Sequence, residues 1–508
     1  KKKQKKKKEL HDTALAAYAP VITRVRDYEN LIFLLLRDIP LFNPLLRTEK
    51  RKNITAQAEV DNKEPQLNVT VLGAGNIGMQ MLLSASWCGQ MFGHSLGLNM
   101  VSIEDVEHVR KHIEQVCPEF LKSAQTDSDL LCIFDGREDR NKPYFTLRYA
   151  KADLVVQNLS DISCKSVVDG GDSHHLLTSD YYVVALGSDE QNIATAELLA
   201  RKIAVYHKEN NIDKDVEIVM FVYDPKICSL FESNEDLNEY AKNHIHIHAY
   251  GSLDFIYSIS NITLIRDNPY AIAMNRNYAA LFAEQGRTET VMQSRQNEVY
   301  NAWSSLARAF HLNYRVYSAH RFLQSSLCAG KKKPLLTEIE ITPEAYGRYN
   351  AMVVPDANKD SEQNDFDPAL ANYLAWLEHR RWNAYLRSIG FITNKNNKEK
   401  DLVLKLHNCL VETKHLPYCH SWYRDGSTGN CDVCRYRIGC AALCATTENG
   451  QVSPLKDKLD VISDAVGTEY KVFDYPSQSD EKLSKNLVVV KKNGEKKRNN
   501  YFGFRNTK

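Results

Sequence analysis

The sequence has almost no net charge, no uninterrupted apolar stretch of membrane-crossing length and no internal repeat of fixed period. Its 65 basic and 64 acidic residues leave a formal charge of +1, which excludes nucleic-acid binding through overall charge, and we expect no specific nucleic-acid partner. The most apolar run, residues 31–46, is broken by Arg37, Asp38 and two prolines and therefore cannot span a bilayer. No secretory signal is evident, so we expect a cytoplasmic protein.

Two common hydrolase signatures are also missing, because the sequence shows neither a Ser-His-Asp order nor an HExxH pattern. Hydrophobic residues make up 43% and charged residues 25% of the chain, as in ordinary globular domains. A length of 508 residues predicts about two to four such domains.

Positive charge is concentrated in residues 1–8, where seven lysines accompany one glutamine. This stretch is either a solvated tail or a polybasic segment next to a membrane span that precedes Lys1, where each lysine would add roughly 1 kcal/mol of attraction to anionic lipid. The pattern of apolar and basic residues over residues 1–63 predicts a helical segment followed by a basic linker. The second interpretation would place the protein at the cytoplasmic face of a membrane.

Residues 64–268 alternate short apolar runs with helix-compatible stretches. This alternation predicts an α/β domain of the Rossmann type, built on a mostly parallel sheet with helices on both faces. The strands are expected at residues 67–72, 98–103, 154–157, 181–186, 216–222 and 245–248.

The turn after the first strand has the GxGxxG spacing of a dinucleotide-binding loop, with glycines at Gly73, Gly75 and Gly78. The first glycine permits a tight turn, the second lets a pyrophosphate approach the backbone, and the third allows close packing of helix on strand. Asn76 and Ile77 complete this loop, and the start of the helix expected over Met79–Cys88 would direct free N–H groups at the phosphates. The structural alternative is a glycine turn that binds nothing.

Two further groups of polar residues are expected at the same edge of the sheet. Glu104 or Asp105 follows the second strand and could accept hydrogen bonds from ribose hydroxyls, which favours NAD, ADP-ribose or another adenine nucleotide over NADP. Ser188, Asp189 and Asn192 follow a later strand and would face the ligand. They are also ordinary helix-capping residues, so both interpretations stay open.

At this point the sequence resembles a known family. NVTVLGAGNIG at residues 68–78 and YYVVALGSDEQNIATAELLARK at residues 181–202 look like the RCK-type domains that regulate potassium transport in Trk systems and ligand-gated potassium channels. The resemblance covers roughly residues 67–265. It implies that bound NAD or an adenine nucleotide switches an attached channel, and that the chain forms a homo-oligomer. The long stretch after the second strand and the lack of a second regulatory subdomain depart from the family's pattern.

Residues 269–365 predict a helical connecting region, and a well-capped helix follows. Asp367 is its expected N-cap, Pro368 its first residue and Gly390 its terminator. Its predicted inner face consists of Leu370, Leu374, Leu377 and Tyr385.

Together with Gly390-Phe391, Lys405-Leu-His407 and Leu416-Pro417, this helix resembles the bacterial form of the ryanodine-receptor repeat (RyR domain). The resemblance covers roughly residues 368–417 and resumes in residues 455–465, within a predicted domain of residues 366–475. The resemblance implies a module that senses a small ligand or a partner. The candidate recognition residues are Trp376, Glu378, His379 and Trp382. The same residues could instead pack inside a core, and the tryptophans could stack on a base or fill that core.

Six of the twelve cysteines lie within residues 409–444. The spacing of four of them predicts a closed structural zinc site that folds the insertion 418–452, with Cys419 or His420 as substitute ligands. An iron–sulfur cluster and free cysteines are the alternatives. The predicted zinc ligands are Cys431, Cys434, Cys440 and Cys444.

Two other parts of the chain are less informative. His244, His246 and His248 alternate along a predicted strand, where they could converge on a metal, although we favour the polar face of a half-buried strand. Residues 476–508 are expected to form a polar tail.

These features predict a nucleotide-responsive sensor and not an enzyme. Ligand-dependent closure would pass through residues 269–365 to the RyR-like module. The output would be ion conductance if a membrane segment precedes Lys1, and the resemblances also suit a bacterial defence pathway triggered by a nucleotide. The alternatives are an NAD-dependent oxidoreductase, for which no catalytic pair can be nominated, and a non-catalytic interaction scaffold.

Overall fold

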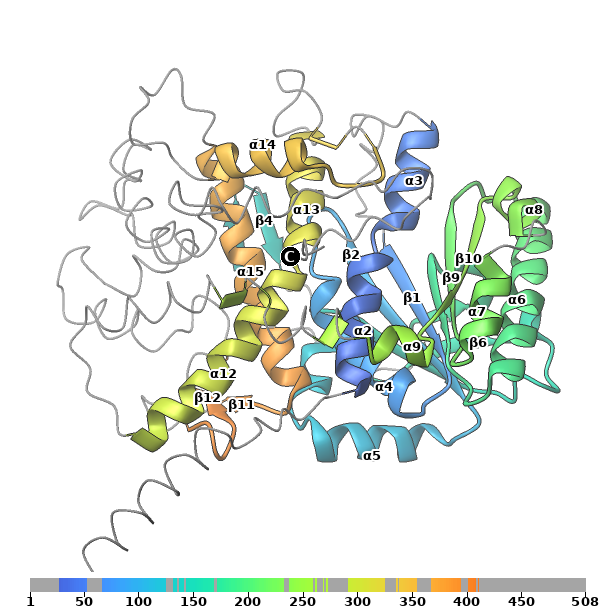
Figure 1. Cartoon of the computed structure of the whole chain (residues 1–508), viewed down its shortest axis with the longest axis horizontal. Coiled ribbons are helices and arrows are strands. Elements are labelled where there is room, and N and C mark those ends of the chain that lie inside the picture. Colours follow the sequence, from blue (N-terminus) through green and yellow to red (C-terminus); the bar gives the residue numbers. More distant parts are fainter. Residues whose placement is uncertain are drawn as a thin grey trace, which may run out of the picture.

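The computed structural model (Figure 1) describes residues 27–52, 66–124, 131–134, 137–140, 143–168, 171–232, 237–258, 261–262, 268, 271–272, 291–324, 335–336, 338–353, 367–393, 401–407 and 410. The predicted zinc ligands Cys431, Cys434, Cys440 and Cys444 lie outside the described residues. So do Cys419, His420 and the predicted tail.

An eight-stranded sheet with the order β10-β9-β8-β1-β2-β5-β6-β7 forms the centre of the fold. Six neighbouring strands are parallel: β1 Gln66–Leu72, β2 Ser95–Ser102, β5 Thr146–Lys151, β8 Tyr181–Val184, β9 Val216–Phe221 and β10 Ile245–Tyr250. In chain order they are arranged 3-2-1-4-5-6, as in doubly wound α/β sheets. The antiparallel strands β6 Ser163–Ser166 and β7 Ser173–His175 extend one edge. The α/β fold predicted from the sequence is therefore confirmed.

One expected strand is wrong. Residues 154–157 form a turn, and the strand β5 ends before them at Lys151. The side chain of Asp153 accepts a hydrogen bond from the N–H of Val155 (3.0 Å) and so closes the turn locally. An apolar Leu-Val-Val run is a strand signal in the sequence, but Val155 and Val156 are both 75% exposed.

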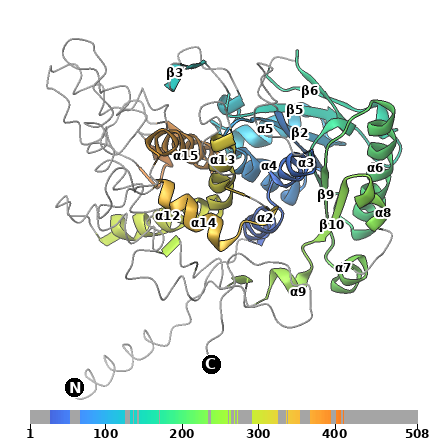
Figure 2. The same cartoon turned by 90° about the horizontal axis from the view of Figure 1, so that it is seen from above.

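Helices cover both faces of the sheet, as Figure 2 shows for α6 on one side and α2, α4 and α15 on the other. The face of α6 carries α6 Asp189–Glu209, α7 Pro225–Glu232 and α8 Leu237–Lys242. The other helices are α2 Asp27–Asp38, α3 Asn43–Lys52, α4 Asn76–Cys88, α5 Val106–Val116, α9 Leu253–Ile256, α12 Val291–Phe310, α13 Leu312–Gln324, α14 Pro343–Val353 and α15 Pro368–Ser388. Two short pairs of strands complete the fold: β3 Leu131–Phe134 with β4 Arg137–Arg140, and β11 Ile392–Thr393 with β12 Leu406–His407.

Helices from before and after the sheet share one interior with it. Trp87 of α4 packs edge-on against Phe33 of α2 and Tyr385 of α15, with 5.5 Å between ring centroids in each pair. Tyr314 of α13 donates a hydrogen bond to the carbonyl oxygen of Leu36 (2.9 Å). The α4 face of the sheet is thus closed by helices that are distant in sequence.

The predicted details of α15 are confirmed. Asp367 accepts a hydrogen bond from the N–H of Leu370 (3.1 Å), Pro368 is the first helical residue, and Gly390 has a φ of 89°. The predicted inner-face residues Leu370, Leu374, Leu377 and Tyr385 are at most 3% exposed. Within the part of the chain that the structure describes, no helix combines the length and apolar character needed to cross a bilayer.

Candidate functional site

Glycines build the turn after β1. Gly73 has a φ of 108°, and a Cβ added to it would collide with the carbonyl oxygen of Ala185 at the end of β8. A Cβ added to Gly78 would collide with the carbonyl oxygen of Gly73. The N–H of Gly73 donates to the carbonyl oxygen of Val101 in β2 (2.8 Å). The turn is therefore held between the ends of β8 and β2, and β1 and β8 are the two strands between which the strand order reverses.

Gly75 and Asn76 face outward from this turn. Gly75 is the N-cap residue of α4, with a φ of −67°, and its Cβ position has no described heavy atom within 4 Å. Both residues are exposed, whereas Ile77 and Gly78 are buried. The first turn of α4 contains no acidic residue, and no described side chain caps it. The positive end of the helix dipole thus opens toward solvent at a point suited to an anion.

The acidic pair after β2 lies at the same edge of the sheet. Asp105 precedes α5, and its Oδ1 accepts a hydrogen bond from Lys151 Nζ of β5 (2.7 Å). Glu104 Oε2 lies 3.2 Å from His108 Nδ1, one helical turn later. All four side chains are at least 45% exposed. Because exposed pairs contribute only about 0–1 kcal/mol, a ribose hydroxyl could replace either partner at small cost.

The loop after β8 is organised by its own polar residues. Ser188 Oγ accepts a hydrogen bond from the N–H of Gln191 (3.3 Å). The Asp189 carboxylate accepts from the N–H groups of Tyr223 (3.0 and 3.1 Å) and Asp224 (3.0 Å), which follow β9. The contact of Ser188 matches the capping interpretation, whereas Asp189 binds the loop after β9 and does not cap α6.

Asn192 joins the same two loops from the first turn of α6. Its side chain is 1% exposed, accepts a hydrogen bond from the N–H of Leu186 (2.7 Å) and donates one to the carbonyl oxygen of Phe221 (2.8 Å). It therefore fixes the backbone next to the glycine turn and does not itself reach solvent.

Exposed apolar side chains accompany the acidic pair, and the sequence reasoning missed them. Ile103 is 68% exposed, and Val155 and Val156 are 75% exposed. The loops that carry them are adjacent, since the N–H of Ala152 donates to the carbonyl oxygen of Ser102 (2.8 Å). Grouped exposed apolar surface often marks a binding site. The exposure of Val155 and Val156 was not expected from the sequence, because residues 154–157 were predicted to be a strand.

Glu378 is packed inside the fold, which agrees with the packing alternative for this residue. It is 4% exposed and accepts two hydrogen bonds from Arg381 (both 2.9 Å). Arg308 Nε lies 3.5 Å and Arg315 Nη1 3.9 Å from its carboxylate. Burial raises the pKa of Glu378, but the three guanidinium groups outweigh this effect and hold the pKa at about 2. The carboxylate is therefore charged at neutral pH.

Trp382 contacts residues from the other segments on which the predicted recognition motif was based. Its ring packs edge-on against His407 at 4.9 Å, and Phe391 lies 6.5 Å from the same imidazole. The helix, the Gly390-Phe391 turn and the strand β12 thus meet at one aromatic cluster. Trp376 and His379 belong to α15, but their side chains lie outside the described residues.

The alternating histidines lie beside acidic residues at the start of β9, Asp215 just before it and Glu217 within it. His246 Nε2 is 3.1 Å from Asp215 Oδ1, and His248 Nε2 is 2.5 Å from Glu217 Oε2. His244 precedes β10 and has a φ of 63°. Among the residues that the structure describes, no group of His, Cys, Asp or Glu side chains could hold a metal ion. The polar-face interpretation thus holds for His246 and His248, whereas His244 lies outside the strand, so the expected alternation of all three along it is wrong.

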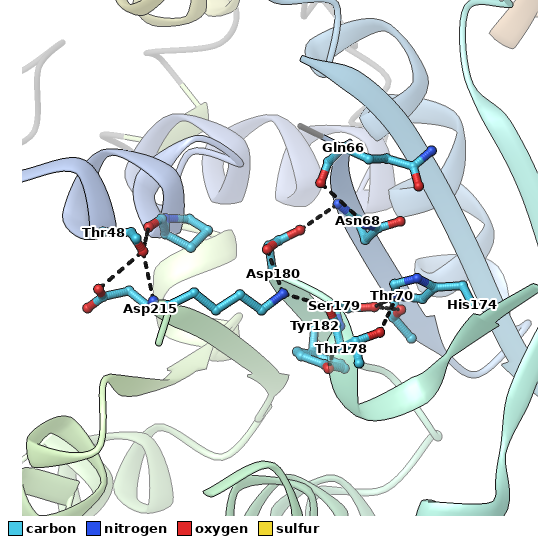
Figure 3. Close-up of polar contacts among 12 residues, drawn as sticks. Thr48, Gln66, Asn68, Thr70, His174, Thr178, Ser179, Asp180, Tyr182 and Asp215 are labelled. Carbon is cyan, nitrogen blue, oxygen red and sulfur yellow. Dashed lines mark hydrogen bonds and ion pairs between the residues drawn. The ribbon is translucent and has the colours of Figure 1, made fainter. Parts of the chain in front are cut away.

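A buried polar network ties β1 to the segment before β8 (Figure 3). Asp180 Oδ2 accepts a hydrogen bond from the N–H of Asn68 (2.7 Å). Ser179 Oγ lies 2.6 Å from Thr70 Oγ1 and 2.8 Å from His174 Nε2. Burial, together with nearby positive charges, lowers the pKa of His174 to about 3, so the imidazole is neutral. Ser179 is 0% exposed, so this Ser-His pair offers no access to a substrate and serves the fold.

Comparison of the chain with models of protein families, with curated proteins and with solved structures finds no match. The function is therefore argued from the geometry at the carboxyl edge of the sheet: the glycine turn, the open start of α4 and the acidic pair after β2.

Proposed function

We propose that the chain is a nucleotide-responsive regulator that binds NAD, ADP-ribose or a related adenine nucleotide, as the RCK-type resemblance implies. The observation that carries the proposal is the position of Gly75. This residue is exposed, has open space around its Cβ position and begins α4 beside the point where the strand order reverses. Ligands of doubly wound sheets bind at this point.

The surrounding residues suit the three parts of such a ligand. A pyrophosphate would accept hydrogen bonds from the N–H groups at the start of α4, near Asn76. Ribose hydroxyls would donate to Glu104 or Asp105. Ile103 and Val155, exposed after neighbouring strands, would cover one face of an adenine base. The regulatory output would then be a change in the RyR-like part and in any membrane effector attached to the chain.

The substitution Gly75→Asp is expected to abolish the stabilisation by nucleotide while the protein still folds. Aspartate is a favoured N-cap residue, the φ of −67° is ordinary for it and the position is open, so the unliganded protein should keep or slightly increase its stability. The new carboxylate would repel the phosphates. Thermal unfolding with NAD, NADH, NADP, ADP-ribose, cyclic ADP-ribose and ATP measures the effect, because a ligand at a hundred times its Kd adds about 2.7 kcal/mol to the wild type.

Gly347→Asp is the matched control, because Gly347 of α14 also has open space around its Cβ position. This variant should respond to nucleotide like the wild type. If no nucleotide stabilises the wild type, the proposed function is wrong. If Gly75→Asp responds as strongly as the wild type, the ligand does not bind at the glycine turn.

Glu104→Gln is expected to weaken NAD binding about tenfold, because glutamine keeps an acceptor but loses its charge, and a hydrogen bond to a charged acceptor contributes roughly 1.5 kcal/mol more than one to a neutral acceptor. Asp105→Asn should change the affinity less than about threefold, since Asp105 is paired with Lys151 at 2.7 Å, more closely than Glu104 with His108 at 3.2 Å. Isothermal titration calorimetry of both variants with NAD gives the comparison. The opposite ranking would assign the ribose contact to Asp105.

A test for turnover of NAD by the purified wild type distinguishes the regulator from the two alternative functions. Oxidation or reduction of the nicotinamide by the purified chain, followed by absorbance, would favour the NAD-dependent oxidoreductase. Binding without turnover supports the regulator, and failure to bind any nucleotide leaves the interaction scaffold.

A further inference from the structure

Two helices lead away from the proposed nucleotide site, and both end against α15. The helix α4 starts at the glycine turn and runs 13 residues to Cys88, and α5 starts after the acidic pair and runs 11 residues to Val116. Figure 1 shows that the C-terminal end of α15 comes close to α5. The helix α15 also packs directly on α4. The contacts at these two helix ends connect the proposed site to the RyR-like part.

The end of α5 meets the turn that follows α15 backbone to backbone. A Cβ added to Gly390 would lie 2.7 Å from the carbonyl oxygen of Val116. The thiol of Cys117 donates a hydrogen bond to the carbonyl oxygen of Ser388 (3.0 Å). The two backbones are therefore in direct contact, at a position where the φ of 89° and the small space favour glycine.

Glu119 extends the contact from α5 to β11. Its side chain is 7% exposed, and Oε2 accepts hydrogen bonds from both the N–H (3.0 Å) and the Oγ1 hydroxyl (2.7 Å) of Thr393. Arg387 Nε of α15 lies 3.8 Å from the same oxygen. The strand β11 pairs with β12, which carries His407 of the aromatic cluster around Trp382. One buried carboxylate thus joins the segment after α5 to the RyR-like motif.

The residues after α4 hold α15 through a second buried contact. Arg380 is 5% exposed, and its Nε donates to Gln90 Oε1 (3.4 Å). Its guanidinium also lies 4.3 Å from the ring centroid of Tyr144, and Gln90 Nε2 donates to the carbonyl oxygen of Tyr144 (2.8 Å). Arg380 is therefore held by Gln90, two residues beyond the end of α4, and by Tyr144.

We infer that α15 and the turn after it report nucleotide occupancy, with α4 and α5 as the two rigid connections. The inference rests on the proposed function. A ligand that contacts both Gly75 and Glu104 would fix the starts of the two helices relative to each other, and helices of this length pass such a constraint to their far ends. The route is direct and differs from the sequence-based expectation of transmission through residues 269–365.

Coupling of this kind has a thermodynamic consequence. A ligand shifts α15 only if its affinity differs between two arrangements of these contacts. By linkage, a change made at the α15 contact must then alter the affinity for the nucleotide by the same factor. The contact between Glu119 and Thr393 is the best place for such a change, because removal of one hydroxyl leaves the backbone hydrogen bond of Thr393 in place.

Thr393→Val is expected to change the Kd for NAD at least about threefold, measured by calorimetry on the full chain. In the wild type, NAD should slow hydrogen exchange in residues 380–393, and this protection should be largely lost in Thr393→Val. The matched control is Thr48→Val, since Thr48 also binds a carboxylate, that of Asp215 (3.2 Å), but contacts neither α5 nor α15 through it. This control should leave the Kd for NAD and the protection of residues 380–393 unchanged.

The outcomes separate this inference from the proposed function. If NAD binds and Gly75→Asp abolishes binding, yet residues 380–393 exchange equally with and without NAD, the coupling is disproved and the nucleotide site stands. If NAD binds and Thr393→Val and Thr48→Val change its Kd equally, the contact is only structural. If no nucleotide binds the wild type, both proposals fail. The hydrogen-exchange measurement on the wild type tests the coupling without any variant. If Thr393→Val does not fold, Glu119→Gln is measured in its place.

Discussion

Replacing Glu378 with glutamine is expected to lower the free energy of unfolding by about 3–5 kcal/mol. The carboxylate is 4% exposed and faces the guanidinium groups of Arg381, Arg308 and Arg315. Glutamine has nearly the same shape but no charge, so the buried guanidinium groups would lose their shared counterion. Urea unfolding of the purified variant measures the loss.

Glu197→Gln is the control for this substitution, because Glu197 is an exposed residue in the middle of α6 and its loss should cost less than about 0.5 kcal/mol. A similar small cost for Glu378→Gln would mean that the arginines do not depend on this carboxylate. Such a result would contradict the buried ion cluster.

Stability at low pH provides an independent check on Glu378. The pKa of this group is held at about 2, below the ordinary value of 4.5, so its contribution is present above pH 4.5 and is lost as the pH falls toward 2. This difference corresponds to about 3 kcal/mol. Between these pH values the wild type should therefore lose more stability than Glu378→Gln. Equal slopes would contradict the assignment.

The glycine turn was predictable from the sequence because its requirements are local. A GxGxxG pattern between an apolar strand and a helix specifies which residue needs a positive φ and which must lack a Cβ, and Gly73 and Gly78 fill these roles in the structure. The caps and inner face of α15 were predictable for the same reason, since hydrogen bonds of the first turn and the helical period depend on neighbouring residues only.

Exposure and long-range contacts were not predictable in this way. The apolar residues 154–156 look like a strand, but the Asp153 turn directs Val155 and Val156 to solvent. The sequence left both packing and recognition open for Glu378, because two of its three arginine partners lie on α12 and α13, about 60 to 70 residues away in the chain. The contact between Glu119 and Thr393 joins residues 274 positions apart and leaves no sequence pattern at all.

Gly78→Ala is expected to destabilise the protein by about 3 kcal/mol and to reduce nucleotide binding with it. The added methyl group would collide with the carbonyl oxygen of Gly73, and only a shift of α4 away from the turn can relieve the collision because the obstacle is backbone. Gly347→Ala is the control, since this helical glycine has open space and its replacement should stabilise the protein by up to about 1 kcal/mol. Thermal unfolding measures the change in stability for both variants. If Gly78→Ala destabilises the protein and Gly347→Ala stabilises it, close packing at the turn requires Gly78. A stabilising effect in both would mean that α4 does not approach the turn as closely as the structure shows, and the placement of the phosphates at its start would lose its basis.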